Sequence, residues 1–75
     1  MKRQMSRMSA HGDEVIAEWD TDTVSAKQLK ELETEFNQRL AEGYFAANIT
    51  EERNELIQRF DPNADILLIP RMQGG

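Results

Sequence analysis

Apolar and polar residues alternate along Glu14–Asp20. Val15, Ala17 and Trp19 occupy every second position and have mostly charged neighbours, which is the period of a strand with one buried face. We therefore predict a strand here, with these three side chains pointing into the core.

The residues before this strand are close enough in sequence to form a hairpin with it. Residues 4–9 are joined to the strand through Ala10-His11-Gly12, a connection short enough for a hairpin. Met5 and Met8 would lie on opposite faces at strand spacing, so the prediction of a partner strand depends on the short connection and not on alternation.

The next apolar positions follow a helical spacing. They are three, four and four residues apart, which places them on one face of a helix; they are Leu29, Leu32, Phe36 and Leu40. Ser25 and Gln28 form the S-x-x-Q pattern of a capping box at the start. Gly43 suits the position that follows a helix end, so we predict a helix over about residues 25–42.

A third strand and a short second helix are predicted after Gly43. Tyr44–Ile49 has the composition of a strand, with Phe45, Ala47 and Ile49 on one face. Thr50 can cap a short helix that has two glutamates near its positive end. Leu56 and Phe60, four residues apart, would then both face the core.

The last element predicted is a fully apolar strand. Asp61-Pro62-Asn63 stops the helix and turns the chain. Ile66–Ile69 is apolar on both faces, as expected of a central strand. The order of elements predicts an α+β domain at residues 1–70, with one main helix packed on one face of a mixed sheet, a short second helix, and a tail at residues 71–75. With the first and last strands central and parallel the fold would be a β-grasp, but periodicity leaves the strand order open.

Composition narrows the classes of function. The 75 residues suffice for one small domain. A net charge of −5 and a pI near 4.7 disfavour nucleic-acid binding, which needs clustered Lys and Arg. The absence of cysteine excludes a disulfide scaffold, a thiolate zinc site and a cysteine nucleophile. With no signal peptide or membrane-spanning stretch visible, we expect a cytoplasmic protein without membrane contact.

Candidate catalytic and metal-binding residues are few. Asp61-x-Asn63-x-Asp65 begins like a calcium loop, but Ile66 stands where such a loop needs glycine, so we interpret it as a turn. His11 has no second ligand at useful spacing, and the acidic run Glu31, Glu33 and Glu35 is interpreted as a solvated helix face. No set of nucleophile, base and orienting group is visible, so we do not expect an enzyme.

The final residues suggest another kind of chemistry. Gly12–Trp19, followed by Asp22-Thr23-Val24 at the approach to the helix, resembles the second strand of ubiquitin and the segment after it. The end of the chain is similar to the small bacterial sulfur carriers of molybdopterin and thiamin synthesis: an acidic turn, an apolar strand, Pro70, and Gly74-Gly75 at the terminus. The chain thus resembles the ubiquitin-like β-grasp family over nearly its whole length. It lacks the Asp-Gly of the carriers before the last strand, which leaves the branch of the family open.

This resemblance implies that Gly75 is the reactive residue. An E1-like adenylating enzyme would use ATP to activate its carboxylate, and no cofactor would be bound permanently. The activated carboxylate would become a thiocarboxylate for a sulfur-accepting synthase, or an isopeptide bond to a lysine with the help of an E2-like enzyme and a deconjugating protease. Both outcomes remain open.

The predicted tail residues suit entry into a narrow active site. Gly74 and Gly75 lack Cβ atoms and pass constrictions that other residues cannot. Pro70 stiffens the backbone where the chain leaves the sheet. The activating enzyme would bind and recognise Pro70, Arg71, Met72 and Gln73. Residues 70–75 can span roughly 20 Å when extended. The alternative hypothesis is a β-grasp adaptor that binds a partner through its surface and has an inert tail.

Overall fold

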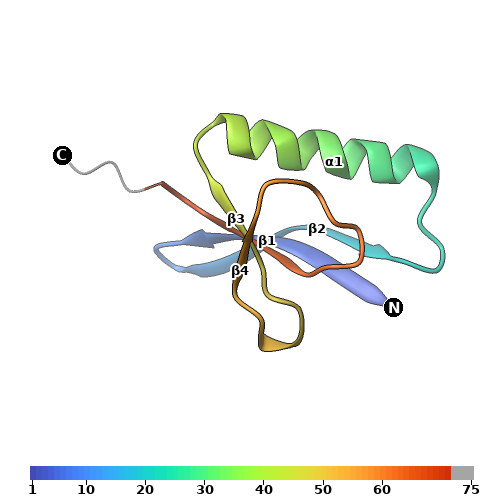
Figure 1. Cartoon of the computed structure of the whole chain (residues 1–75), viewed down its shortest axis with the longest axis horizontal. Helices are drawn as coiled ribbons and strands as arrows, with labels where there is room; N and C mark the ends of the chain where they lie inside the picture. The colour runs from blue at the N-terminus through green and yellow to red at the C-terminus, as the bar shows by residue number, and fades with distance from the viewer. Residues whose placement is uncertain (72–75) are drawn as a thin grey trace.

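The structure is a computed structural model that describes residues 1–71. Its elements are β1 (Lys2–Ser9), β2 (Gly12–Asp20), α1 (Ala26–Ala41), β3 (Phe45–Asn48), a short 3₁₀ turn η1 (Thr50–Glu52), β4 (Glu55–Ile57) and β5 (Ile66–Ile69). Helix α1 lies across one side of a five-stranded sheet (Figure 1), whose strand order is β2-β1-β5-β3-β4. Strands β1 and β5 are parallel and the other pairs are antiparallel. The chain is therefore a small α+β protein with a mixed sheet, as predicted.

The predicted first hairpin is confirmed. Strands β1 and β2 pair from Lys2 opposite Asp20 to Ser9 opposite Gly12. Gly12 has a φ of 108°, a conformation that glycine adopts without a steric penalty. The Ser9 hydroxyl donates to the Gly12 carbonyl oxygen at 2.6 Å and closes the turn. Met5 is fully buried and Met8 is 40% exposed, so the two methionines do lie on opposite faces.

The inward direction predicted for Val15 is wrong, because β2 contains a bulge. Met5 pairs with Ala17 and Ser6 pairs with Val15, which leaves Ile16 without a partner on β1. One extra residue reverses the alternation of faces. Trp19 and Ala17 point toward α1 as predicted, and Ile16 also packs against the core. Val15 lies on the other face and is 46% exposed.

The predicted main helix is confirmed at both ends. The Ser25 side chain accepts a hydrogen bond from the Gln28 backbone N–H at 3.1 Å. At the other end Gly43 donates to the Leu40 carbonyl at 3.0 Å and Tyr44 donates to the Arg39 carbonyl at 3.1 Å. These two bonds form a Schellman motif around Gly43, whose φ is 105°.

The core lies between α1 and the sheet. Its buried residues are Met5, Trp19, Leu32, Phe36, Ala46, Ala64, Ile66 and Leu68, while Leu29, Leu40 and Phe60 pack against them. The ring centroid of Phe60 lies 5.6 Å from that of Trp19 and 5.9 Å from that of Phe36. Phe60 thus extends the aromatic packing between the sheet and the helix, as predicted for an inward-facing side chain.

The short second helix is not formed. Glu51 and Glu52 have φ values of 53° and 66°, which are left-handed and cannot begin a right-handed helix. The chain instead turns, with Arg53 N–H donating to the Thr50 carbonyl at 3.0 Å, and enters the unpredicted strand β4. Leu56 is 69% exposed, so its predicted burial is wrong. The spacing of four from Leu56 to Phe60 suits a helix, but only Phe60 packs against the core.

Phe45 and Ala47 of β3 share one face as predicted, and it is the face turned away from α1. Ala46 is buried in the core and pairs laterally with Leu68, another core residue. Phe45 therefore lies on the opposite face of the sheet, where it is 49% exposed. Ala47 shares that face and is nevertheless fully buried, because it is small and sits between larger neighbours on β4 and β5.

Candidate functional site

The predicted tail begins directly after the central strand β5. Pro70 and Arg71 are exposed and follow β5 at the end of the molecule where α1 also ends (Figure 1). The other predicted site residues, Met72, Gln73, Gly74 and Gly75, lie outside the described residues.

The face of the sheet turned away from α1, called the outer face below, carries apolar side chains across all five strands. Lateral pairing places one residue from each strand in a single row, in the order Val15, Ser6, Leu67, Ala47 and Leu56. Ser6 and Ala47 are small and buried, whereas Val15 and Leu56 at the two ends are exposed. This row has an aliphatic side chain at the centre and at both ends.

A second apolar group on the outer face lies one step nearer to the tail. Phe45 pairs with Ile69, the last residue of β5. In the parallel pair β1–β5, Arg7 lies beside Leu68. The next residues along the two strands, Met8 and Ile69, therefore lie side by side on the outer face, so Met8 belongs to the same group. Phe45 and Met8 are 49% and 40% exposed. The apolar surface therefore extends to the residue that immediately precedes Pro70.

Among residues 1–71 no helix covers this surface (Figure 1). A contiguous exposed apolar surface on a small domain is typical of a partner-binding site. It can exclude water against another protein. The hydroxyl in the row, that of Ser6, is buried and accepts from the Gln4 side-chain amide at 3.5 Å.

Charged residues flank the core side of the same end of the sheet. Arg7 of β1 donates to the Glu14 carboxylate of β2. The Glu14 carboxylate, and then the Tyr44 hydroxyl, raise the pKa of Arg7 above its ordinary value. The Arg39 guanidinium lies 6.0 Å from the centre of the Tyr44 ring. These pairs tie β1, β2 and the end of α1 together near the point where β5 ends.

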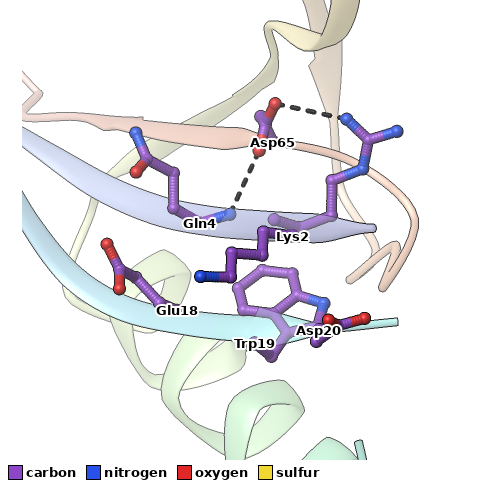
Figure 2. Close-up of a pocket in the computed structure, with 7 residues that line it drawn as sticks. Lys2, Gln4, Glu18, Trp19, Asp20 and Asp65 are labelled. Atoms are coloured by element: carbon purple, nitrogen blue, oxygen red, sulfur yellow. Dashed lines mark hydrogen bonds and ion pairs between the residues drawn. The ribbon is translucent and has the colours of Figure 1, made fainter. Parts of the chain in front are cut away.

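A separate pocket of about 520 Å³ lies at the paired ends of β1 and β2 (Figure 2). It is lined by Lys2, Arg3, Gln4, Glu18, Trp19, Asp20 and Asp65. The Asp22 backbone N–H, followed by the amino-terminal ammonium, lowers the pKa of Asp20. The pocket has charged groups of both signs but no nucleophile beside a base.

Asp65, at the rim of this pocket, joins three parts of the chain. Its carboxylate accepts from the Gln4 backbone N–H at 3.1 Å and from the Arg3 guanidinium at 3.3 Å (Figure 2). Its own N–H donates to the Thr50 hydroxyl at 2.8 Å. These contacts account for the carboxylate as a structural group. The start of β1, which lines the pocket, lies at the opposite end of the molecule from the end of β5 (Figure 1).

The minor candidates from the sequence are the 61–65 segment, whose Asp65 also lines the pocket, and His11. The 61–65 segment is a turn as predicted, since the Asp61 carboxylate accepts from the Asn63 N–H at 2.9 Å. His11 is exposed in the β1–β2 turn. Within residues 1–71 no three His, Asp or Glu side chains gather as metal ligands. No helix in this part of the chain has the length and apolar character needed to cross a membrane.

Comparison with family models, curated proteins and solved structures gave no match.

Sequence reasoning missed the outer face. It placed Val15 and Leu56 in the core and put Phe45 and Ala47 on one face without saying which, whereas Val15, Phe45 and Leu56 all lie on the uncovered side of the sheet. One sequence feature could have indicated the surface: Ile66–Ile69 is apolar at every position, so a central strand with one helix above it must present apolar side chains below it as well.

Proposed function

We propose that this chain is a cytoplasmic, ubiquitin-like β-grasp protein that acts as a carrier or modifier. An E1-like enzyme would adenylate the Gly75 carboxylate with ATP. For sulfur transfer, the terminal sulfur of a persulfide would displace AMP, and a thiol would reduce the resulting acyl disulfide to release a thiocarboxylate. For conjugation, a cysteine thiol would displace AMP, and a protein lysine would then displace that thiol. The chain itself would be the substrate of these reactions and not an enzyme.

The strand arrangement supports the β-grasp assignment. In the order β2-β1-β5-β3-β4, the first and last strands are parallel neighbours within the sheet, and α1 crosses one face. The five-stranded mixed sheet with one main helix is compatible with that fold. The sequence resemblance at both ends of the chain leads to the same family.

The observation that carries the proposal is the position of the outer face relative to the tail. The exposed apolar side chains extend to Ile69, and Pro70 follows directly. An enzyme that docks on the outer face would therefore already be beside the start of the tail. Because residues 70–75 can span roughly 20 Å, the same enzyme could hold the domain on its surface and receive Gly75 in a nucleotide site.

Each part of the tail would have a separate task in this reaction. Pro70 has no N–H for a further ladder bond and so ends the strand pairing. Arg71 offers a guanidinium to an acidic group on the enzyme, and Met72 offers a flexible apolar side chain. Gln73 would complete the recognised segment, and Gly74 and Gly75 would enter the constricted active site.

ATP–pyrophosphate exchange with a candidate E1-like enzyme tests this function, because it detects adenylation whichever product follows. We expect exchange with the full chain and none after deletion of Gly75. Intact mass then separates the outcomes: a sulfur-for-oxygen exchange marks the carrier, and adducts on other proteins mark the modifier. The absence of exchange with every E1-like enzyme from the source genome would refute the proposal.

A substitution on the outer face tests whether the activating enzyme contacts this surface. Leu56→Ser changes a highly exposed side chain and should leave the fold intact, but it should raise KM for the chain with little effect on kcat. Gln38→Ser on the exposed side of α1 is the matched control. Equal KM values for the two variants would show that the outer face does not contact the enzyme.

A non-conjugated adaptor is the second candidate, and the outer face favours it on its own. An apolar surface with 69% exposure at Leu56 can bind a partner without any chemistry at the tail. A partner that binds the full chain and the Gly75 deletion with equal affinity, without adenylation, would support this alternative.

A further inference from the structure

The start of the tail lies against the C-terminal end of α1, in a place set by the strand register. Phe45 pairs with Ile69 in an antiparallel ladder, so continuing the same register puts Tyr44 opposite Pro70 and Gly43 opposite Arg71. Contact distances agree with this placement: a Cβ built on Gly43 would lie 4.0 Å from both Cβ and Cδ of Arg71. Arg71 is therefore beside the helix end although the ladder itself stops at Ile69.

A hollow of about 370 Å³ surrounds this contact. It is lined by Ala41, Glu42, Gly43, Tyr44, Pro70 and Arg71. Gly43 has two roles here. Its φ of 105° forms the Schellman turn, and its Cα lies against the stem of Arg71, where even an added Cβ would make only an ordinary contact at 4.0 Å.

Electrostatics favour the same placement of Arg71. The C-terminal end of a helix carries partial negative charge, and a nearby cation is stabilised by it. Glu42, the C-cap residue, adds a carboxylate to the lining of the hollow. The Glu42 carboxylate lies 3.9 Å from the Arg39 guanidinium. Within residues 1–71 Arg71 forms no ion pair at salt-bridge distance, so the attraction between Glu42 and Arg71 acts across the hollow.

We propose that the Glu42-Gly43 corner is a seat for the start of the tail, and that both residues are positioning residues for the reaction at Gly75. The seat holds the stem of Arg71 against α1 and so limits the directions in which the following residues leave the domain. A docked enzyme then meets Arg71 in a defined place beside the end of the helix. The inference concerns the proposed activation at Gly75 and rests on it, but the seat itself can be tested without any enzyme.

Glu42→Lys is the informative change. It replaces attraction by repulsion at Arg71 and removes the exposed 3.9 Å pair with Arg39. A cation near the helix C-terminus favours α1 itself, so the fold should survive. Glu42→Gln removes the charge alone and should have an intermediate effect. Glu33→Lys makes the same charge change at an exposed helix position that does not line the hollow, and is the matched control.

Limited trypsin digestion of the full chain measures the seat, because trypsin cuts after Arg71. Intact mass identifies the products of the first cut, since the lysines that the variants introduce add cleavage sites of their own. Cleavage requires Arg71 to leave the corner, and the initial rate is compared with cleavage after the exposed Arg53 in the same molecule. Exposed charge pairs contribute about 0.2–1 kcal/mol, so Glu42→Lys should raise the relative rate about 1.4- to 5-fold. An unchanged relative rate, or an equal rise in Glu33→Lys, would overturn the seat.

The reaction provides the second measurement. With an activating enzyme, Glu42→Lys should raise KM by a similar factor and leave kcat unchanged, because fewer molecules present the tail in the competent direction. A change in cleavage without a change in KM would retain the seat but refute its positioning role. Absence of activation of the wild-type chain would refute the proposed function, and the trypsin result would still decide whether the seat exists.

Discussion

The turn between β3 and β4 should become more stable when glycine replaces Glu52. Glu51 and Glu52 are the two non-glycine residues with positive φ in the described chain, at 53° and 66°. Together with the Arg53 N–H to Thr50 carbonyl bond of 3.0 Å, these angles match a type I′ turn, in which Asn-Gly is the preferred central pair. The turn thus has hairpin geometry with an unfavourable sequence.

The magnitude follows from two opposing terms. A non-glycine residue in the left-handed region costs about 1–2 kcal/mol relative to the right-handed one. Glycine removes this penalty but gives the unfolded chain more freedom, which costs about 0.5–1 kcal/mol. We therefore expect Glu52→Gly to raise the free energy of unfolding by about 0.5–1 kcal/mol, which corresponds to a rise in Tm of about 2–8 °C for a domain of this size.

Urea denaturation followed by the fluorescence of Trp19 measures this change, because Trp19 is the only tryptophan and is 4% exposed in the core. Glu52→Gln is the control for charge, since it removes the carboxylate but keeps a side chain at the same backbone angles. Glu33→Gly in α1 is the control for glycine itself and should cost about 1 kcal/mol. If Glu52→Gly destabilises the chain as Glu33→Gly does, the residue does not have left-handed geometry and the reasoning fails.

Three further changes test other parts of the structure by thermal or chemical denaturation. Ser25→Ala removes the cap acceptor of α1 and should lower the free energy of unfolding by about 1 kcal/mol. An unchanged Tm would show that this cap does not stabilise the fold. Trp19→Phe leaves the Pro62 carbonyl without its 2.8 Å donor and should cost about 1–3 kcal/mol, measured by circular dichroism. The pKa of Asp20 is lowered, chiefly by the Asp22 N–H. The ionised carboxylate therefore adds to the free energy of unfolding above the unfolded carboxyl pKa of about 3.9, and this addition is lost as pH falls through the folded pKa. Asp20→Asn should therefore flatten the acid side of the stability–pH profile, and an identical slope in wild type and variant would contradict this.

The parts of the fold that the sequence predicted correctly are those with local causes. The helix from Ala26 to Ala41 has its cap at Ser25, its stop at Gly43 and an apolar face between them, all within a few residues of one another. The first hairpin follows from a short connection. In each case the residues that determine the element are also the residues that form it.

The errors arose where a distant partner decides the outcome. The bulge at Ile16 depends on how β2 meets β1, and without it the alternation Val15, Ala17, Trp19 would place all three side chains on one face. Leu56 was assigned to the core because its spacing of four from Phe60 suits one face of a helix, and the pattern of β3 did not say which face of the sheet Phe45 and Ala47 occupy. An apolar surface on both sides of a sheet cannot be distinguished from a larger core by periodicity alone.

The proposed site depends on one strand register more than on any single residue. Phe45 opposite Ile69 puts Phe45 on the outer face beside the end of β5, and the same register puts Arg71 against Gly43 at the end of α1. A slip by one residue would turn Phe45 toward the core and place Arg71 opposite Glu42, so that the apolar surface and the seat would both be lost. Because Pro70 cannot donate a ladder bond, the pairing ends one residue before it. The chain therefore leaves the sheet at the point where the exposed apolar surface and the end of the helix meet.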